Sequence, residues 1–332
     1  MPAPKQTLVT GGTGMVGHFI VASLLRRGHR VRALVRSLDK GRRLLPDCEL
    51  VEGDVTMPAS LAPAVAGCDW VFHAAGFPEQ WMKDHQTFER INADGTANMV
   101  AAARAAKVGR FVFTSTIDVF TWRPGADYDE SEIDPAPKGT SYERSKQRAD
   151  RIVSDAVAAG LDAVFLHPSA VYGPATSDSP GVNELIVRLA NDKVPGLLPG
   201  GFPVVFGPDA GEGHVLAAER AQPGARYILS ERYYTLADQA REMLRVLGIE
   251  RKLPRVLPLW LASMVSTMGE LKAGIAGGPP LIPKGQLKLL QVDSYPVAAR
   301  ATAELGLAFT PFADGLATTV EWLRAGGRLP VP

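Results

Sequence analysis

The chain has 332 residues, of which 46% are hydrophobic and 21% charged, a balance typical of a globular protein with a sizeable core. Its 36 Lys and Arg residues against 35 Asp and Glu leave a formal net charge of +1, which favours no nucleic-acid partner. Cys48 and Cys68 lack the spacing of a metal or redox site. We therefore expect a reduced, cytoplasmic protein without a disulfide framework.

Short apolar runs alternate with helical stretches through the first half of the chain. The runs are continuous rather than alternating, as in strands that helices cover on both faces. This pattern predicts an α/β fold of the Rossmann type, with a doubly wound parallel sheet. The expected strands are 7–10, 30–35, 48–53, 69–75, 110–116 and 161–168, and the expected helices are 15–27, 58–66, 94–107 and 141–160.

The second half changes character, because Pro and Gly clusters separate its expected helices. We expect a dinucleotide-binding domain over 1–170 and a smaller, mostly helical substrate lobe over 171–332, packed on the first. Helices are expected near 182–192, 214–221, 235–247, 255–274 and 311–325. The apolar stretch 253–274 is interrupted by Arg255, two prolines and Glu270 and falls short of the about 20 apolar residues of an integral membrane segment. We interpret it as a buried or pocket-covering helix in preference to a membrane anchor, and the sequence leaves open whether it touches a membrane or an apolar ligand.

The stretch "LVTGGTGMVGHFI" (8–20) places Gly11, Gly14 and Gly17 between an expected strand and an expected helix. Glycines here allow a tight turn, let backbone N–H groups approach a pyrophosphate, and let the helix pack closely on the strand. No Gly-Lys-Ser/Thr follows, so a P-loop is rejected. The stretch predicts a dinucleotide site.

Residues at the ends of the next strands extend this site. Arg36 follows the second strand, where an arginine accommodates the 2′-phosphate of NADP and an acidic residue would bind the ribose of NAD. "EGDVT" (52–56) and "FHAAG" (72–76) end two further strands with residues suited to adenine binding and to close backbone approach. His73 lies in no metal-ligand cluster and is interpreted as a hydrogen-bonded structural residue.

Two groups of residues predict proton chemistry. Thr114, Ser115 and Thr116 end a strand with three hydroxyls. The Thr140–Glu143 capping box begins a helix on which Tyr142 and Lys146 lie one turn apart on the same face. A tyrosine with an ordinary pKa of about 10 is a poor base near neutrality, and we expect the lysine ammonium and the positive nicotinamide of an oxidised cofactor together to lower that pKa.

These motifs occur in the order seen in a known family. TGGTGMVG, Arg36, GDV, HAAG, "NADGTAN" (92–98), TST, YERSK and "HPSAVYGP" (167–174) resemble the extended short-chain dehydrogenases/reductases, the NAD-dependent epimerase/dehydratase superfamily. The resemblance covers about the first 175 residues and, more loosely, the C-terminal lobe. It is strongest to the branch of dihydroflavonol reductases and 3β-hydroxysteroid dehydrogenases.

The resemblance implies roles for individual residues. Tyr142 would be the catalytic acid/base, Lys146 its partner, and Thr116 or Ser115 the hydroxyl that orients the substrate. The family usually has serine where this chain has Thr116. NADP(H) is the favoured cofactor and NAD(H) the other possibility, with no metal. The expected cofactor-binding residues are Gly11, Thr13, Gly14, Met15, Val16, Gly17, Arg36, Asp54, Val55, Ala74, Ala75, Gly76, Asn92, Thr114, Tyr142, Lys146, His167, Pro168 and Ser169.

The expected function is the interconversion of a bulky, largely apolar ketone or aldehyde and its alcohol. Phe77, Trp81, Trp122 and Tyr172 are the expected substrate-binding residues. One alternative is a nucleotide-sugar epimerase or dehydratase with tightly bound NAD, against which Arg36 and the loop "GFPEQW" (76–81) argue. A noncatalytic cofactor-sensing protein is the other. The resemblance also suggests a homodimer, formed through helices 94–107 and 141–159.

Overall fold

A seven-stranded parallel sheet forms the centre of the computed structural model, which describes residues 3–79, 81–175, 181–276, 280 and 282–329. The strand order is β10-β7-β5-β4-β1-β2-β3. From β1 the sheet grows in one direction through β2 and β3 and in the other through β4, β5, β7 and β10, so the strand order reverses between β1 and β4. Ligands bind to such sheets at the carboxyl ends of the strands beside this point. The strands are β1 (Gln6–Thr10), β2 (Arg30–Val35), β3 (Glu49–Glu52), β4 (Trp70–His73), β5 (Arg110–Thr114), β7 (Ala163–Pro168) and β10 (Arg226–Leu229).

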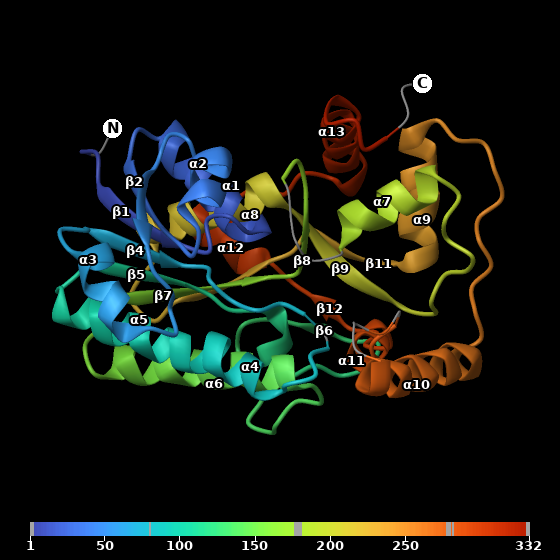
Figure 1. Cartoon of the computed structure of the whole chain (residues 1–332), viewed down its shortest axis with the longest axis horizontal. Helices are drawn as coiled ribbons and strands as arrows, with labels where there is room; N and C mark the ends of the chain where they lie inside the picture. The colour runs from blue at the N-terminus through green and yellow to red at the C-terminus, as the bar shows by residue number, and fades with distance from the viewer. Residues whose placement is uncertain (1–2, 80, 176–180, 277–279, 281, 330–332) are drawn as a thin grey trace.

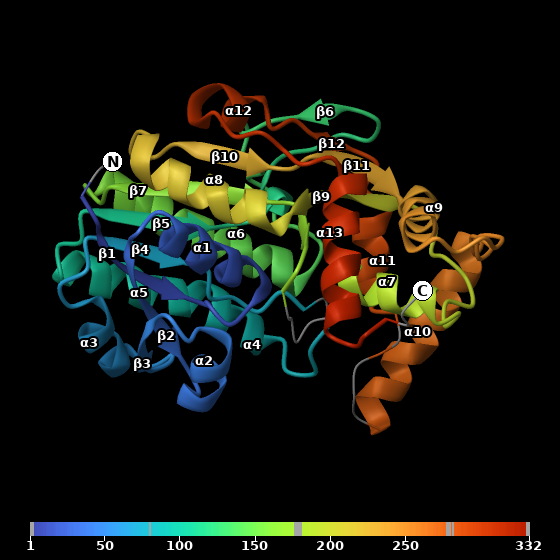
Figure 2. The ribbon, with the colours of Figure 1, turned by 90° about the horizontal axis from the view of Figure 1, so that it is seen from above.

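Helices cover both faces of this sheet (Figures 1 and 2). One face carries α1 (Met15–Arg26), α2 (Leu38–Leu44), α8 (Gly207–Arg220) and α12 (Ala299–Leu305). The other carries α3 (Leu61–Val65), α5 (Gly95–Ala105) and α6 (Ser141–Ala158), with the short α4 (Gln86–Phe88) nearby. Each face has its own apolar core, because the strand side chains are buried alternately above and below. The expected α/β fold is confirmed.

The sheet also takes in a part of the chain beyond residue 170. β10 pairs with β7 in parallel, and α8, which leads towards it, packs against α1. The division of the chain at residue 170 stays a prediction, but a Rossmann domain defined by the sheet includes α8 and β10. Helix α8 begins at Gly207, seven residues before the start expected from sequence.

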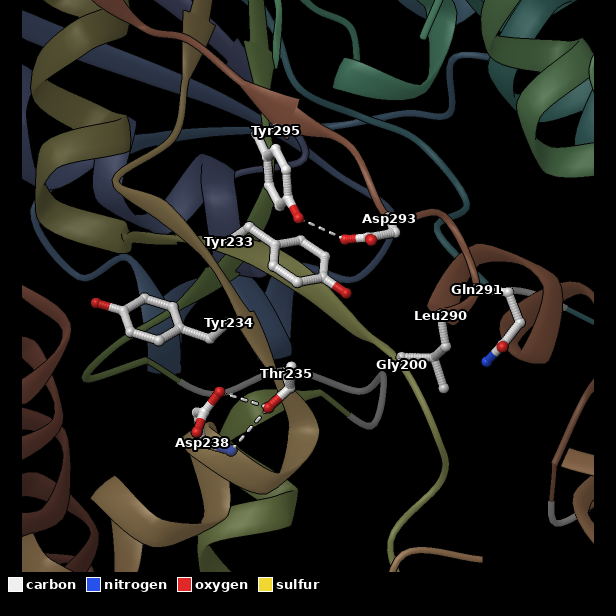
Figure 3. A pocket seen from close by; sticks show the side chains of 9 residues that line it. All are labelled: Gly200, Tyr233, Tyr234, Thr235, Asp238, Leu290, Gln291, Asp293 and Tyr295. Atoms are coloured by element: carbon white, nitrogen blue, oxygen red, sulfur yellow. Dashed lines mark hydrogen bonds between the residues drawn. The ribbon is translucent and has the colours of Figure 1, made fainter. Parts of the chain in front are cut away.

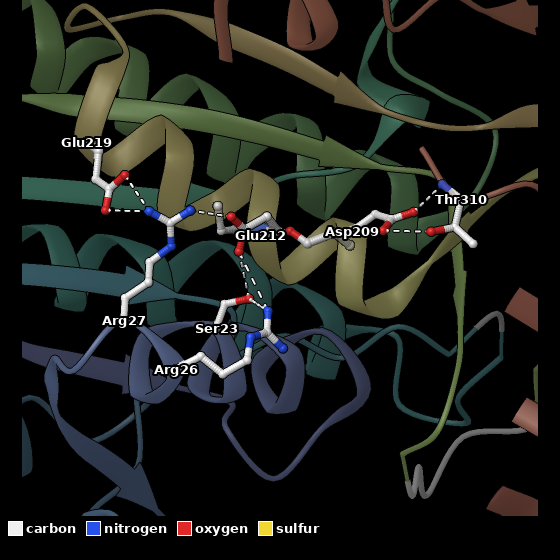
Figure 4. Close-up of polar contacts among 9 residues, drawn as sticks. Ser23, Arg26, Arg27, Asp209, Glu212, Glu219 and Thr310 are labelled. Carbon is white, nitrogen blue, oxygen red and sulfur yellow. Dashed lines mark hydrogen bonds and ion pairs between the residues drawn. The ribbon is translucent and has the colours of Figure 1, made fainter. Parts of the chain in front are cut away.

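Helices α1 and α8 approach each other closely. A Cβ on Gly211 would lie 2.3 Å from the carbonyl oxygen of Phe19, so glycine is required at this crossing. Arg27 adds polar contacts, bonding to Glu212 and, at 2.7 Å, to Glu219 (Figure 4). These contacts fix α8 on the outside of the sheet.

The second lobe lies beyond the carboxyl ends of the strands (Figure 1). Two small sheets belong to it or border it, β11-β9-β8 and β12-β6, neither of which the sequence predicted. Its apolar core is formed by residues of α7, α9, α13 and the first of these sheets. The elements are β6 (Asp127–Tyr128), β8 (Ala170–Tyr172), α7 (Val182–Ala190), β9 (Gly201–Phe206), β11 (Arg232–Thr235), α9 (Leu236–Leu247), α10 (Leu259–Ala276), α11 (Lys284–Leu290), β12 (Tyr295–Pro296) and α13 (Phe312–Ala325).

Helix α10 corrects one expectation. The sequence predicted a buried or pocket-covering helix here, but Trp260 and Leu271 are each 68% exposed. The prediction failed because overall apolarity does not say which side of a helix faces the protein. Among the described residues, none of the helices has the length and apolarity needed to span a bilayer.

Candidate functional site

The glycine-rich turn that connects β1 to α1 lies against the segment that follows β4. Gly11 has a φ of +74°, and a Cβ there would lie 2.6 Å from the Ala74 carbonyl carbon. A Cβ on Gly17 would lie 2.2 Å from the Gly11 carbonyl oxygen. The turn therefore tolerates no side chain at these two positions, and it holds strand, helix and the β4 end together.

The N-terminus of α1 has the properties of an anion site. Gly14 is its N-cap and offers no side chain to the first N–H groups, and the first turn contains no acidic residue. The positive end of the helix dipole and free N–H groups suit a pyrophosphate. The residues present thus fit a dinucleotide cofactor. Thr13, Met15 and Val16 are partly buried in this turn, where the sequence predicted them to contact it.

The ends of β2 and β3 lie beside this turn in the sheet. Arg36 follows β2 directly and is exposed, and no ion pair of the described residues involves it. Asp54 uses one carboxylate oxygen to accept hydrogen bonds from the backbone and hydroxyl of Thr56, at 2.8 and 2.7 Å. Val55 is buried against Gly95, where a Cβ would approach it to 2.8 Å. Arg36 is therefore the cationic group available to a ligand at this edge.

His73 at the end of β4 is a structural residue, as expected. The Thr96 hydroxyl donates to the Asn92 carbonyl at 2.6 Å, so it must accept from Nε2 of His73 at 3.0 Å. Nδ1 then accepts from the Thr10 hydroxyl at 2.8 Å, which itself accepts from the Ala75 N–H at 3.1 Å. Burial lowers the pKa of His73 to about 3, so the ring is neutral. This chain of bonds holds the Ala74–Gly76 segment in place.

Asn92 lies in a π-helical segment, Glu89–Asp94, and is buried. Its amide accepts from the Phe77 N–H at 2.7 Å and donates to the Phe77 carbonyl at 3.3 Å. It also donates at 2.9 Å to Ser145, whose hydroxyl donates to the Tyr142 carbonyl at 2.7 Å. Asn92 therefore connects the loop after β4 to the first turn of α6.

Tyr142, Thr116 and Asp118 form the polar centre of the site. Thr116 donates its hydroxyl hydrogen to Oδ2 of Asp118 at 2.8 Å, and both residues lie close enough to Tyr142 to act on the pKa of its hydroxyl. Burial and the charge of Asp118 raise the pKa of Tyr142 in the protein alone. The expected lowering of this pKa also depended on the nicotinamide of an oxidised cofactor, and the sequence prediction missed the carboxylate. The phenol is therefore protonated at neutral pH.

Lys146 is buried near this polar centre. Its Nζ donates to the Thr114 carbonyl at 2.7 Å and lies 4.9 Å from the centre of the Phe113 ring. Burial lowers the pKa of Lys146 to about 8, partly opposed by Asp150 and Asp118. The expected capping box of Thr140 and Glu143 is present and starts α6 where the sequence predicted.

The hydroxyls of Thr114 and Ser115 point to other partners. Thr114 bonds to Nε2 of His214 at 3.0 Å. Ser115 donates to Asp150 at 2.8 Å, and Asp150 pairs with Arg226 at 2.8 Å. Of the three hydroxyls, Thr116 is the one that acts on the pKa of Tyr142.

His167 holds the segment that contains Thr116 in place. It is completely buried, and its Nδ1 lies 3.1 Å from the Thr116 carbonyl, to which it donates because Nε2 faces the Arg226 guanidinium at 3.4 Å. Burial lowers the pKa of His167 well below its ordinary value. Its side chain positions Thr116, so a cofactor contact at His167, Pro168 or Ser169 would use the backbone or the Ser169 hydroxyl.

The expected substrate-binding residues do not share one environment. Phe77 and Trp81 are partly buried after β4, and the Phe77 ring packs on Phe88 at 5.4 Å. Trp122 is partly buried after Thr116, with the Lys138 ammonium 5.4 Å from its ring centre. Tyr172 is different: it is 1% exposed and packs in the second lobe's core.

The burial of Tyr172 corrects that prediction. Its hydroxyl donates to the Phe312 carbonyl at 3.3 Å, and its ring contacts Phe206 and Phe312. A side chain enclosed in this way presents no surface to a ligand. The polar tip of the residue made it look like a pocket residue in the sequence, but a backbone carbonyl 140 positions away satisfies it.

A cavity of about 510 Å³ lies in the second lobe, separate from this polar centre (Figure 3). Tyr233 and Tyr295 meet edge to face in its wall at 5.3 Å, and the Tyr295 hydroxyl donates to Asp293. Tyr295 lies in β12, which pairs with β6 in the segment that follows Thr116. The cavity is lined by Gly200, Tyr233, Tyr234, Thr235, Asp238, Leu290, Gln291, Asp293 and Tyr295.

Sequence reasoning missed three residues of the site. Asp118 was detectable, since an acid two residues after a threonine is a common local turn pattern, but nothing in the pattern placed it beside Tyr142. Asp150 and Ser145 lie on α6 with Tyr142 and were indistinguishable from surface residues. Their roles depend on partners that are distant in sequence, Ser115 and Asn92.

Comparisons with known proteins agree with this geometry. The profile of the NAD-dependent epimerase/dehydratase family matches residues 7–229. A Synechocystis protein provisionally named dihydroflavonol 4-reductase is 31% identical over 96% of this chain and 94% of its own. Sterol demethylase protein B of Methylococcus capsulatus is 28% identical over 97% and 99%. The crystal structure of gox2253 is 30% identical, with a TM-score of 0.83 over 98% of this chain and 100% of its own.

Proposed function

This chain belongs to the NAD-dependent epimerase/dehydratase family of extended short-chain dehydrogenases/reductases, and from that premise we propose that it is an NADP-dependent reductase of bulky, largely apolar ketones or aldehydes. Its general class, an NAD(P)-dependent oxidoreductase, follows from the family and its named relatives. The preference for NADP, the role of the tyrosine and the kind of substrate are the proposal.

The observation that carries the proposal is the protonated Tyr142 beside Thr116. When bound, NADPH supplies the hydride that reaches the carbonyl carbon. Tyr142, whose pKa is raised, donates its proton to the carbonyl oxygen, and Thr116 orients that oxygen. The products are the alcohol and a tyrosinate that must recover a proton. The acid form of the phenol is the form that reduction of a carbonyl requires.

The cofactor is proposed to lie across the carboxyl ends of β1, β2 and β4. The uncapped N-terminus of α1 would hold the pyrophosphate, and the exposed Arg36 would bind a 2′-phosphate. Lys146 is proposed to contact the ribose of the cofactor, as the family resemblance implies. Its ammonium is held in position by a hydrogen bond to the Thr114 carbonyl. Thr114, Asn92 and His167 then act as supports.

The proposed substrate class rests on the apolar side chains near the site. Phe77, Trp81 and Trp122 come from the two loops that border Tyr142 and Thr116, and they are only partly buried. Aromatic walls with few polar groups suit an apolar ligand. The relative from Methylococcus capsulatus is named for a sterol, a compound of this kind.

A turnover screen separates this function from its alternatives. Purified protein is incubated with NADPH and a panel of apolar ketones and aldehydes, and NADPH consumption is followed beside an epimerisation assay on UDP-sugars. We expect consumption with an apolar carbonyl and no epimerised sugar. Epimerisation without net cofactor consumption would instead identify a nucleotide-sugar enzyme, and cofactor binding with neither reaction would indicate a sensor.

We also propose that the protein is a homodimer that pairs through α5 and α6. This rests on the family resemblance alone. Sedimentation equilibrium measures the mass of the protein in solution. A monomer at working concentrations would refute the proposed dimer.

A further inference from the structure

Large apolar side chains are exposed almost entirely in one part of this molecule. Seven are exposed among the described residues, and all but Met57 lie between positions 256 and 271. Trp260, Met268 and Leu271 are the most exposed of them, at 68%, 65% and 68%. Contiguous apolar surface of this kind marks an interaction site on an otherwise polar protein.

Helix α10 is oriented with its large side chains outward. Trp260, Met264, Met268 and Leu271 fall within about 80° of the helix circumference, counting 3.6 residues per turn. The opposite side consists of small residues that are buried against the protein, Ala262, Ser266 and Ala273. This is the reverse of a helix that packs on its own core. The helix thus packs on the protein through its small residues and exposes its large apolar ones.

The surroundings of this stripe are cationic. Residues 251–290 contain six Lys or Arg residues and a single acid, Glu270. The Glu270 carboxylate already pairs with Lys284. It lies 3.8 Å from the Lys284 ammonium and accepts a hydrogen bond from the Lys284 backbone N–H. The other exposed cations of this segment include Lys252, Arg255, Lys272 and Lys288. Arg255 and Lys272 lie towards the two ends of α10.

We infer that α10 is an interfacial helix that lies on the surface of an anionic lipid bilayer. In this arrangement Trp260, Met264, Met268 and Leu271 enter the boundary between headgroups and acyl chains, and the surrounding cations contact the headgroups. An exposed apolar stripe of Trp, Leu and Met suits the boundary between headgroups and acyl chains, and the Lys and Arg residues of the adjoining segments together with Lys272 suit anionic headgroups. The helix lies on the surface without crossing the bilayer, in keeping with its length and interruptions.

A second copy of the chain is a poorer occupant of the same surface. In a twofold contact the same patch meets itself, so Arg255, Lys272 and their neighbours would face like charges. The one acid in the region is already paired. Helix α10 also lies at the periphery of the second lobe, away from the seven-stranded sheet, so a flat membrane could reach it (Figures 1 and 2). The inference does not depend on the proposed reductase activity.

Vesicle sedimentation tests the inference. The full-length protein is spun with vesicles of phosphatidylcholine and phosphatidylglycerol, and separately with phosphatidylcholine alone. We expect binding to the anionic vesicles that weakens as salt is raised. The triple variant Trp260→Ser/Met268→Gln/Leu271→Gln should bind at least about tenfold more weakly, because it removes the inserted side chains.

Two further variants provide the controls. Met57→Gln removes the exposed methionine outside α10 and should bind vesicles like the unmodified protein. Arg255→Gln/Lys272→Gln keeps the apolar stripe and should lose affinity for anionic vesicles only. Circular dichroism and thermal melting check that each variant is folded. The inference is overturned if the unmodified protein ignores anionic vesicles, if the triple variant binds equally well, or if the triple variant only converts a dimer into a monomer.

Discussion

Thr116 donates its hydroxyl hydrogen to Asp118 at 2.8 Å while its oxygen also accepts the Asp118 N–H at 3.3 Å. The same hydroxyl lies close enough to Tyr142 to oppose the effects of burial and Asp118, which raise the pKa of that residue. One residue earlier, Ser115 points to the opposite side and bonds to Asp150. Two adjacent hydroxyls therefore have different tasks: Thr116 belongs to the polar centre of the site, and Ser115 belongs to a buried ion pair.

Substitution of these two hydroxyls should separate activity from stability. Thr116→Ala should lower kcat by about a hundredfold or more, because the substrate oxygen loses its orienting partner, with little effect on Tm. Ser115→Ala should retain most activity but cost about 1–3 kcal/mol of unfolding free energy, since it removes a bond to the buried Asp150. Steady-state kinetics and urea unfolding on both proteins measure this. The reverse pattern would assign substrate orientation to Ser115.

Removal of the Tyr142 hydroxyl should abolish turnover without abolishing cofactor binding. Tyr142→Phe keeps the ring and loses the proton, so kcat should fall by about 10²–10⁴-fold while the Kd for NADPH changes little. Lys146→Ala should weaken both, because the ammonium is proposed to contact the ribose. Calorimetric titration beside initial-rate measurements distinguishes these effects. Substantial activity in Tyr142→Phe would contradict the proposed proton donor.

Charge reversal at Arg36 should invert the cofactor preference. The unmodified protein is expected to bind NADPH more tightly than NADH, because an exposed guanidinium can form charge-assisted bonds to the 2′-phosphate. Arg36→Asp should weaken NADPH binding by about 10–100-fold. Arg30→Asp is the matched control, since Arg30 is exposed at the start of β2, the opposite end of the strand that Arg36 follows. Equal affinities of the unmodified protein for both cofactors would refute the role of Arg36.

Asp118 should make stability depend on pH in a defined direction. Burial and the nearby Glu143 raise the pKa of Asp118 to about 6, above its unfolded value of about 4. The folded state therefore binds this proton more tightly than the unfolded state does. The contribution of Asp118 to the free energy of unfolding falls as the pH rises from about 4 to 6.

The variant Asp118→Asn removes this titration. Its unfolding free energy relative to the unmodified protein should rise by about 1.4 kcal/mol for each pH unit between about 4 and 6, and stay constant above. Urea unfolding of both proteins at pH 4.5 and pH 7 gives the difference. A pH-independent difference would show that Asp118 titrates normally.

The sequence by itself determined six of the seven strands of the sheet and the motifs at their ends, but not β10. The expected strands and the helices of the first half lie where the apolar runs and glycines predicted them, because buried parallel strands and a glycine turn leave strong local signals. The Thr140–Glu143 box likewise placed Tyr142 and Lys146 on one helical face before any tertiary contact was known. These features depend on residues a few positions apart.

Only the tertiary structure decided what those residues face. Asp118 raises the pKa of Tyr142, and Tyr172 is buried against Phe312, through contacts that no local pattern records. The same holds for α10: its sequence is apolar on one side and small on the other, and which side is covered depends on the shape of the lobe beneath it. Local periodicity determines the element, whereas burial and charge depend on partners brought from far along the chain.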